Sequence, residues 1–331
     1  MSVCMIALLF GSPVIALAAG TSEADPTETI TLRIASSHAG GSFAEEFLTE
    51  YKERVEQQLG DRIEIIVVMD GVLGAGDDVL QGLGSGLFQA SLAASEVMAT
   101  NSAANVFELP YLFADRSEVL TLINSPAYDL IAAGFQENNV RLAAIWDNGF
   151  RVITNNVRPI VTPDDLQGVI LRTPQSPTRM RMFAELGANP TPMPFGEVYS
   201  ALDTGVIDGQ ENPASYIYAS GLLEVQKYMS ISNHVYLPTF LLFGEPFIAQ
   251  TPDEILEVLF SVAQELTEWT LEQGHAADED VIDRMANLVA INAIDAESFQ
   301  TAALTLYDTP LFADRIGDEM IQASLEALGR R

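Results

Sequence analysis

The sequence predicts an α/β fold, because segments typical of strands alternate with segments typical of helices from residue 30 onward. Residues 30–35 and 62–68 are rich in β-branched side chains, and residues 43–59 between them place apolar groups at helical spacing. A helical stretch interrupted by glycines begins at residues 77–82, and residues 88–94 form a third apolar run. Alternation of this kind is typical of a sheet that helices cover on both faces.

Capping chemistry predicts two helix starts farther along the chain. Residues 162–165 and 251–254 both place threonine at the N-cap, proline at the first helical position and an acid three residues after the threonine. The second helix should be long, because apolar residues then recur at steps of three and four, namely Ile255, Leu259, Val262, Leu266 and Trp269. The chain shows no repeat and no obvious linker, so a second domain has to form by the chain crossing over more than once.

The first twenty residues are interpreted as an export signal peptide. They carry no charge, and their apolar run ends in Ala16-Leu17-Ala18, a small-x-small pattern that signal peptidase could cut. A buried N-terminal helix is the alternative, which the polar, turn-rich residues 21–26 disfavour. The single cysteine, Cys4, lies within this segment. We therefore expect a periplasmic protein whose mature chain has no thiol.

The charge of the chain excludes one class of partner. The formal net charge is −30, and only two lysines occur, Lys52 and Lys227. Nucleic acid is excluded as a natural partner, because a polyanion needs a basic face. After residue 20 no segment approaches the ~18 to 20 continuous apolar residues of a membrane span, so the mature chain is not expected to cross a membrane. If the ligand is an anion, the site must hold its own local positive charges.

A search for catalytic motifs is negative. The three histidines, His38, His234 and His275, form no HExxH motif and no pair at metal spacing. The sequence also has no nucleophile elbow and no P-loop. We therefore expect neither an enzyme nor a cofactor or metal site.

The strongest candidate for ligand binding is Arg172, which ends the apolar segment Val-Ile-Leu-Arg directly before Thr173-Pro174. An arginine at a strand end projects into the crevice outside the sheet, the usual ligand position in open α/β folds. Its planar guanidinium can hold a carboxylate through two parallel charge-assisted hydrogen bonds. The alternative is a structural ion pair with one of the many acids. Asn212, in a predicted strand end and tight turn at residues 206–213, could add an amide to the same clamp.

Three segments of the chain resemble the solute-binding proteins of TRAP (tripartite ATP-independent periplasmic) transporters, the DctP family. They are GFRVITNNVRPIVTPDDLQGVILRTPQSP at residues 149–177, LGANPTPMPFGEVYSALDTGVIDGQENP at residues 186–213 and EVQKYMSISNHVY at residues 224–236. The resemblance implies a two-domain periplasmic-binding-protein fold with a ligand cleft between the domains and chain crossovers linking them. We expect domain I to comprise residues 29–148 and 238–277, and domain II residues 149–237 and 278–331.

The same resemblance implies roles for six residues. Arg172 corresponds to the principal carboxylate-binding arginine, Arg151 to a supporting arginine and Asn212 to an amide that contacts the same carboxylate. Phe195 corresponds to an aromatic wall, Gln175 to a variable polar contact and His38 to a contact in the loop after the first strand. Sialic-acid receptors of the family carry a glutamate where this chain has Ala94, which disfavours sialic acid, although Glu96 is close by.

The function implied by the resemblance is an extracytoplasmic receptor that binds a C4-dicarboxylate, a sugar acid or another small carboxylate. Such a receptor delivers its ligand to TRAP membrane permease subunits, which use an ion gradient for uptake. Two alternatives stay open at this point. One is a sensory receptor of the same fold that presents its ligand to a signalling protein, and the other is a secreted hydrolase or lyase.

Overall fold

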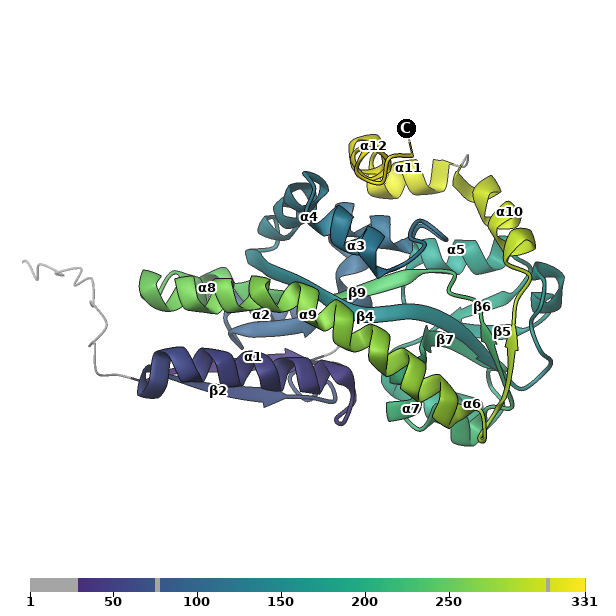
Figure 1. The fold of residues 1–331 in the computed structure, drawn as a ribbon, viewed down its shortest axis with the longest axis horizontal. Coiled ribbons are helices and arrows are strands. Elements are labelled where there is room, and N and C mark those ends of the chain that lie inside the picture. Colours follow the sequence, from purple (N-terminus) through teal and green to yellow (C-terminus); the bar gives the residue numbers. More distant parts are fainter. Residues whose placement is uncertain (1–28, 75–77, 308–309, 331) are drawn as a thin grey trace, which may run out of the picture.

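The computed structural model describes residues 29–74, 78–307 and 310–330, so the export signal expected in residues 1–20 lies outside the described residues. A mixed sheet of ten strands runs through the molecule, with helices packed on it (Figure 1). The main path of the sheet has the order β2-β1-β3-β9-β4-β7-β5-β6, while β8 pairs with β4 and β10 pairs with β8. The α/β prediction is confirmed.

The strands are β1 Ile30–Ser36, β2 Ile63–Val68, β3 Ala90–Ala93, β4 Val140–Asn155, β5 Ile170–Thr173, β6 Asn189–Pro192, β7 Gly209–Pro213, β8 Tyr228–Ile231, β9 Tyr236–Gly244 and β10 Ala290–Ala293. The α-helices are α1 Phe43–Leu59, α2 Asp78–Ser85, α3 Arg116–Ile123, α4 Ala127–Gln136, α5 Pro177–Glu185, α6 Val198–Asp203, α7 Ala214–Ala219, α8 Glu245–Ile248, α9 Asp253–Met285, α10 Ala296–Tyr307, α11 Pro310–Ile316 and α12 Asp318–Ala327. The 3₁₀ helices are η1 Gly60–Arg62, η2 Ser95–Ala99, η3 Ala103–Glu108, η4 Pro163–Leu166, η5 Phe195–Glu197 and η6 Leu222–Val225.

Strand β4 connects the two halves of the sheet. It is 16 residues long, pairs antiparallel with β9 along its first part, and pairs with β7 and β8 along its second part. Its register with β9 shifts between Trp146 and Gly149, a β-bulge of the kind that turns side chains out of the regular alternation. Gly149 has a φ of 121°, a backbone conformation that favours glycine. The bulge lies beside the cavity described below, which Asn148 helps to line.

Helix α9 runs diagonally along the molecule and packs against β4, α1 and α7 (Figure 1). Four residues of its predicted apolar stripe, from Ile255 to Leu266, are buried, and Trp269 is half-buried. The indole N–H of Trp146 in β4 donates to the carbonyl of Ala263 at 2.8 Å. Gly274 allows the closest approach, since a Cβ there would lie 1.8 Å from the carboxylate of Asp147. The long-helix prediction is confirmed.

The two capping predictions have different outcomes. At residues 162–165 the backbone N–H of Thr162 donates to the carboxylate of Asp165 at 2.8 Å, but the helix that follows is only the 3₁₀ turn η4. At residues 251–254 the prediction is wrong about the cap. Helix α9 begins at Asp253 with Pro252 at its N-cap, and the hydroxyl of Thr251 instead donates to the carbonyl of Phe247 in α8 at 2.8 Å.

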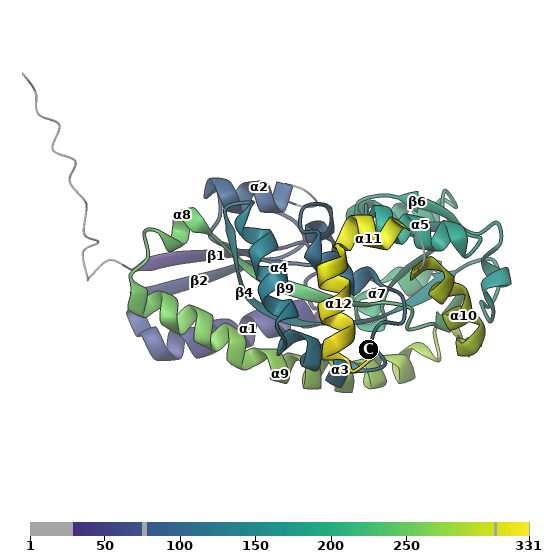
Figure 2. The ribbon, with the colours of Figure 1, turned by 90° about the horizontal axis from the view of Figure 1, so that it is seen from above.

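The C-terminal helices return to the middle of the molecule. Helix α12 packs against α3 and α4, and the three lie together in the view from above (Figure 2). The guanidinium of Arg330 donates to both carboxylate oxygens of Glu118 in α3, at 2.8 and 2.6 Å. The end of the chain is therefore held against α3. The domain boundaries given above stay a prediction.

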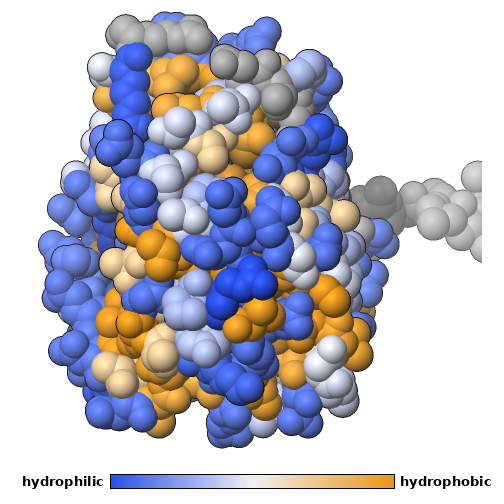
Figure 3. Space-filling view, turned by 90° about the vertical axis from the view of Figure 1, so that its right-hand side faces the viewer, coloured by the Kyte–Doolittle hydropathy of each residue, from blue (hydrophilic) through white to orange (hydrophobic). Residues whose placement is uncertain are grey.

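The surface at the β5–β6 end of the molecule intersperses hydrophilic and hydrophobic residues (Figure 3). Of the helices that the structure describes, none is long and apolar enough to cross a lipid bilayer, and this includes the 33-residue helix α9.

Four buried charged residues join η3, β4, α5 and β7. In β7, Glu211 accepts hydrogen bonds from Arg151 of β4, one of them 2.9 Å long from Nη2 to Oε1, and from Arg179 Nη1 of α5 at 2.8 Å. Arg179 also donates from Nε to Glu108 of η3 at 2.8 Å. His234 Nε2 lies 3.2 Å from Glu211. All are at most 2% exposed, so these ion pairs form away from water.

The charge of Glu211 depends on its partners. Burial opposes ionisation of this carboxyl, but Arg151 and Arg179 outweigh burial and hold its pKa well below the usual range. Two guanidinium groups and two carboxylates thus balance one another. We call Glu108, Arg179, Glu211 and Arg151 the buried ion chain.

We predict that Glu211→Gln lowers the free energy of unfolding by about 3–5 kcal/mol, because it leaves Arg151 and Arg179 buried without their shared carboxylate. The stability that ionised Glu211 contributes is present above the 4.5 of an ordinary glutamate pKa and is lost as the pH falls toward the lower pKa of the folded state. Urea unfolding at several pH values measures both effects. The control is Glu257→Gln on the exposed face of α9. A loss no larger than that of the control would contradict the prediction.

Candidate functional site

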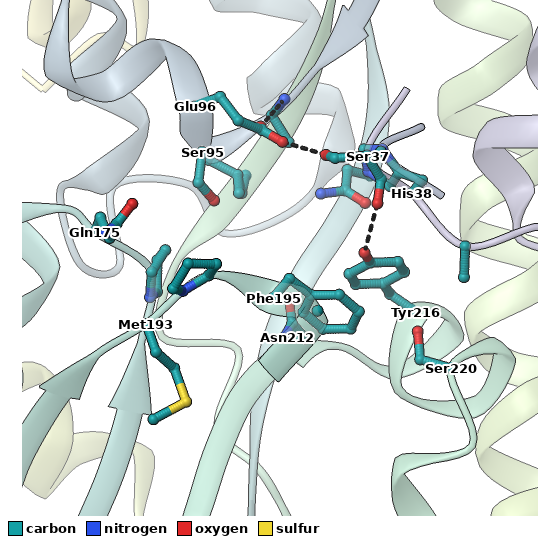
Figure 4. A pocket seen from close by; sticks show the side chains of 18 of the residues that line it. Ser37, His38, Ser95, Glu96, Gln175, Met193, Phe195, Asn212, Tyr216 and Ser220 are labelled. Carbon is teal, nitrogen blue, oxygen red and sulfur yellow. Dashed lines mark hydrogen bonds between the residues drawn. The ribbon is translucent and has the colours of Figure 1, made fainter. Parts of the chain in front are cut away.

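One cavity of about 550 Å³ brings together all six residues singled out from the sequence (Figure 4). They are His38, Arg151, Arg172, Gln175, Phe195 and Asn212. One side of the cavity is formed by segments that follow β1, β2 and β3, and the other by the C-terminal ends of β5 and β7 and the segment after β6. Its volume is typical of a site for a small molecule. Residues far apart in the sequence therefore share one pocket.

Arg172 is placed by the parallel strand β5, whose end carries it into the cavity. The side chain is 4% exposed, and its Nε and Nη2 both donate to the carbonyl of Met193, at 3.0 and 2.7 Å. A guanidinium has five N–H donors, so three stay available at its outer end. Within the part of the chain that the structure describes, Arg172 forms no ion pair.

The electrostatic surroundings of Arg172 are unfavourable for a cation. The pKa of its guanidinium falls to about 10, chiefly because the group is buried; Glu211 opposes this fall, and the charges of Arg151 and Arg179 contribute to it. The group nevertheless stays protonated at neutral pH. Arg172 is thus a buried positive charge whose counter-ion the described chain does not supply, which is a favourable arrangement for an anionic ligand.

Arg151 lines the same cavity, but unlike Arg172 it is paired with a carboxylate. Its Nε and Nη2 both donate to the carboxylate of Glu211, and Nη2 also donates to the Glu211 carbonyl at 2.6 Å. Sequence reasoning missed Glu211, Arg179 and Glu108. The available signal was a glutamate inside the short strand Gly209–Pro213. Every residue of this strand is buried, so the charge of the glutamate needs partners within the protein.

The amide of Asn212 is held by its neighbours on the same strand face. Its Nδ2 donates to Gln210 Oε1 at 2.6 Å, and Gln210 Nε2 donates to the hydroxyl of Thr154 in β4 at 2.8 Å. Asn212 is 3% exposed and lines the cavity, so its second amide hydrogen and its oxygen are the polar groups left for a ligand.

A row of rings crosses the cavity between its two sides. Phe195 at the start of η5 lies 5.8 Å from the guanidinium carbon of Arg172 and stacks on Tyr216 with 4.5 Å between ring centroids. The ring of Tyr216 in turn lies 5.2 Å from that of His38. Tyr216, which sequence reasoning missed, therefore joins the predicted aromatic wall to the loop after β1. Its helix, α7, follows directly after the predicted Asn212 segment.

His38 is buried beside Ser36, with 3.0 Å between its Nδ1 and the serine hydroxyl. Burial lowers the pKa of His38, and the nearby charge of Glu96 counteracts burial only in part. The imidazole is therefore neutral at pH 7 and can either donate or accept a hydrogen bond. Gln175 lies on the other side, after β5, and is exposed.

Carboxylates also line the cavity. Glu96 on η2 accepts hydrogen bonds from the Ser37 hydroxyl and from the backbone N–H of Ala94, the latter at 2.8 Å. Ala94, the position where sialic-acid receptors were expected to carry a glutamate, lines the cavity too, as does Asp70. No sequence pattern distinguishes these acids from the others among the 46 in the chain.

The chain is similar to known proteins over most of its length. Residues 34–313 match the family described as bacterial extracellular solute-binding protein, family 7. The 2,3-diketo-L-gulonate-binding periplasmic protein YiaO of Escherichia coli is 28% identical to the chain over 256 residues, which cover 76% of the chain and 78% of that protein. The C4-dicarboxylate-binding protein DctB of Bacillus subtilis is 31% identical over 245 residues, which cover 73% and 70%.

A solved structure extends the similarity to the fold. The sugar acid binding protein DctPAm from Advenella mimigardefordensis, in complex with galactonate, matches with a TM-score of 0.87 and 26% identity, covering 92% of this chain and 99% of that one. These relatives are named as binding proteins, not as enzymes. The chain belongs to the bacterial extracellular solute-binding proteins of family 7, the DctP family of TRAP transporter receptors, and has their two-domain α/β fold with a ligand cleft between the domains.

Proposed function

We propose that this chain is the extracytoplasmic receptor of a TRAP transporter. It binds one small organic acid, a sugar acid or a C4-dicarboxylate, and delivers the acid to TRAP permease subunits in the membrane for uptake driven by an ion gradient. Residues 1–20 serve as the signal peptide that exports it to the periplasm. The relatives support this ligand class, since their names record 2,3-diketo-L-gulonate, galactonate and C4-dicarboxylates.

The observation that carries the proposal is the unpaired guanidinium of Arg172 in the wall of the cavity. A ligand carboxylate supplies the missing counter-ion and accepts two parallel hydrogen bonds from N–H groups at the outer end of the guanidinium. Charge-assisted bonds in such a buried site are strong, because little water competes for them. The carboxylate end of the ligand is therefore anchored at Arg172.

The other predicted site residues complete the contacts. The free amide hydrogen of Asn212 donates to the same carboxylate, and the ring of Phe195 packs against the carbon chain of the ligand. Arg151 acts through Glu211 and Asn212 more than by direct contact, because Glu211 already accepts from its Nε and Nη2. His38 binds a polar group at the far end of the ligand, and Gln175 is a polar contact on the side of β5.

Ligand binding is coupled to closure of the cleft. The six site residues come from stretches as far apart as His38 and Asn212, which we assign to domain I (29–148 and 238–277) and domain II (149–237 and 278–331). The bulge at Gly149 in β4 lies at the proposed boundary, where the chain passes between the two domains. Closing the cleft removes water and strengthens the polar contacts inside.

We predict that Arg172→Ala weakens binding of the carboxylate ligand by roughly a hundredfold or more, because one partner of a buried charge pair is lost. Arg172→Lys should restore binding only in part, since an ammonium cannot reproduce the two parallel bonds. Isothermal titration calorimetry measures both. The matched control is Arg181→Ala on the exposed side of α5. Unchanged affinity in a folded Arg172→Ala protein would refute the role of Arg172.

We also predict that the liganded protein is more compact than the free protein. Small-angle X-ray scattering should show a smaller radius of gyration when a bound acid holds the two domains together. The same acid added to Arg172→Ala should leave the profile unchanged, because the anchor is missing. Identical profiles for the free and liganded wild-type protein would instead support a rigid pocket.

A further inference from the structure

The charged residues that line the cavity are unevenly distributed between its two sides. Arg151 and Arg172 lie on the side of β4 and β5, and the charge of Arg151 is already balanced by Glu211. The other side carries three carboxylates, which we call the acidic wall: Asp70, Asp78 and Glu96. None of the three forms an ion pair with an arginine, lysine or histidine among the described residues. The cavity therefore has one free cation opposite an excess of negative charge.

Glu96 is the best-defined member of the acidic wall. It is half-buried, and its two oxygens accept from the Ser37 hydroxyl and the Ala94 backbone N–H, so the carboxylate is held in place. Figure 4 shows Glu96, Ser37 and Ser95 on the side of the pocket opposite Met193, whose carbonyl holds Arg172. Its oxygens retain lone pairs for further donors, because a carboxylate can accept about four hydrogen bonds.

The charge of Glu96 acts on the pocket itself. Burial raises the pKa of Tyr216 well above its usual value, and Glu96 adds to that rise. Burial lowers the pKa of His38, and Glu96 opposes that fall. Both rings lie in the row that crosses the cavity, so a ligand lying along that row is exposed to the same negative field.

This distribution decides which groups fit the far end of a ligand. A second carboxylate would meet the like charges of Glu96 and Asp70 with no cation to offset them. The neutral groups there, Ser95 and Asn148, can both donate and accept hydrogen bonds. A hydroxyl also does both, whereas an ammonium only donates, so hydroxyl groups satisfy this mixture of partners best.

We infer that the cavity selects a monocarboxylate with several hydroxyl groups over a dicarboxylate, with Arg172 holding the carboxylate and the acidic wall accepting hydrogen bonds from the hydroxyls. This inference rests on the proposed function, since it assigns the substrate class of the same site. The specificity-determining residue is Glu96, and Asp70 assists it.

Calorimetry with six-carbon aldonates (D-gluconate, D-galactonate and L-gulonate) and with succinate tests this inference. The wild-type protein should bind its preferred aldonate at least about tenfold more tightly than succinate, and Glu96→Gln should reduce that preference by about tenfold. Asp70→Asn should act in the same direction. The control is again Glu257→Gln, which should leave the preference unchanged.

Equal or tighter binding of succinate by the wild-type protein, or a preference that Glu96→Gln does not change, would overturn the inference. Tighter binding of the zwitterion 4-aminobutyrate than of any aldonate would overturn the assignment of hydroxyl groups. The Arg172→Ala variant separates these results from a failure of the proposed function. If only the selectivity is wrong, this variant still loses the bound acid, whereas unchanged binding in it would refute the proposed function itself.

Discussion

The arrangement of the site depends on the buried ion chain of Glu108, Arg179, Glu211 and Arg151. These residues come from η3, α5, β7 and β4, and each is at most 2% exposed, so their charges must be balanced within the protein. Two carboxylates balance two guanidinium groups. The ion chain fixes α5 and β7 against β4, and it leaves Arg172 as the guanidinium in this region without a carboxylate partner among the described residues.

The same constraint explains how a chain of net charge −30 can hold an anion. Salt screens exposed surface charges over about 8 Å at physiological ionic strength, whereas a buried contact is screened much less. Arg172 acts at contact distance inside a cavity, while most of the acids lie on the surface. The acidic wall is the exception, because Glu96 and Asp70 reach the cavity and act on the far end of the ligand.

Much of the fold could be predicted from residue patterns, whereas most of the site residues could be predicted only from the resemblance to relatives. The β-branched residues at 30–35 located β1, and the helical spacing of apolar residues located α1 with its bounds of 43–59. Arg172 and Asn212 followed from their strand-end positions and the other four site residues from a resemblance to relatives; all six line one cavity, although their individual roles stay predictions. The partner of Arg151 could not be predicted, because contact with Glu211 depends on the register of β4 and β7, which places Ile153 opposite Glu211. Thr251 was misassigned because only the structure shows that α8 ends just before it.

The central claim is that Glu211 balances the charge of Arg151, whereas the charge of Arg172 is balanced only when a ligand carboxylate binds. Thermal unfolding of the ligand-free Arg151→Met and Arg172→Met variants tests it most directly, because methionine keeps the side-chain volume but removes the charge. Arg151→Met should lower the melting temperature by several degrees, since it leaves Glu211 with fewer partners. Arg172→Met should leave the melting temperature unchanged or raise it, because an uncompensated buried charge is removed. Equal destabilisation by both substitutions would contradict the account.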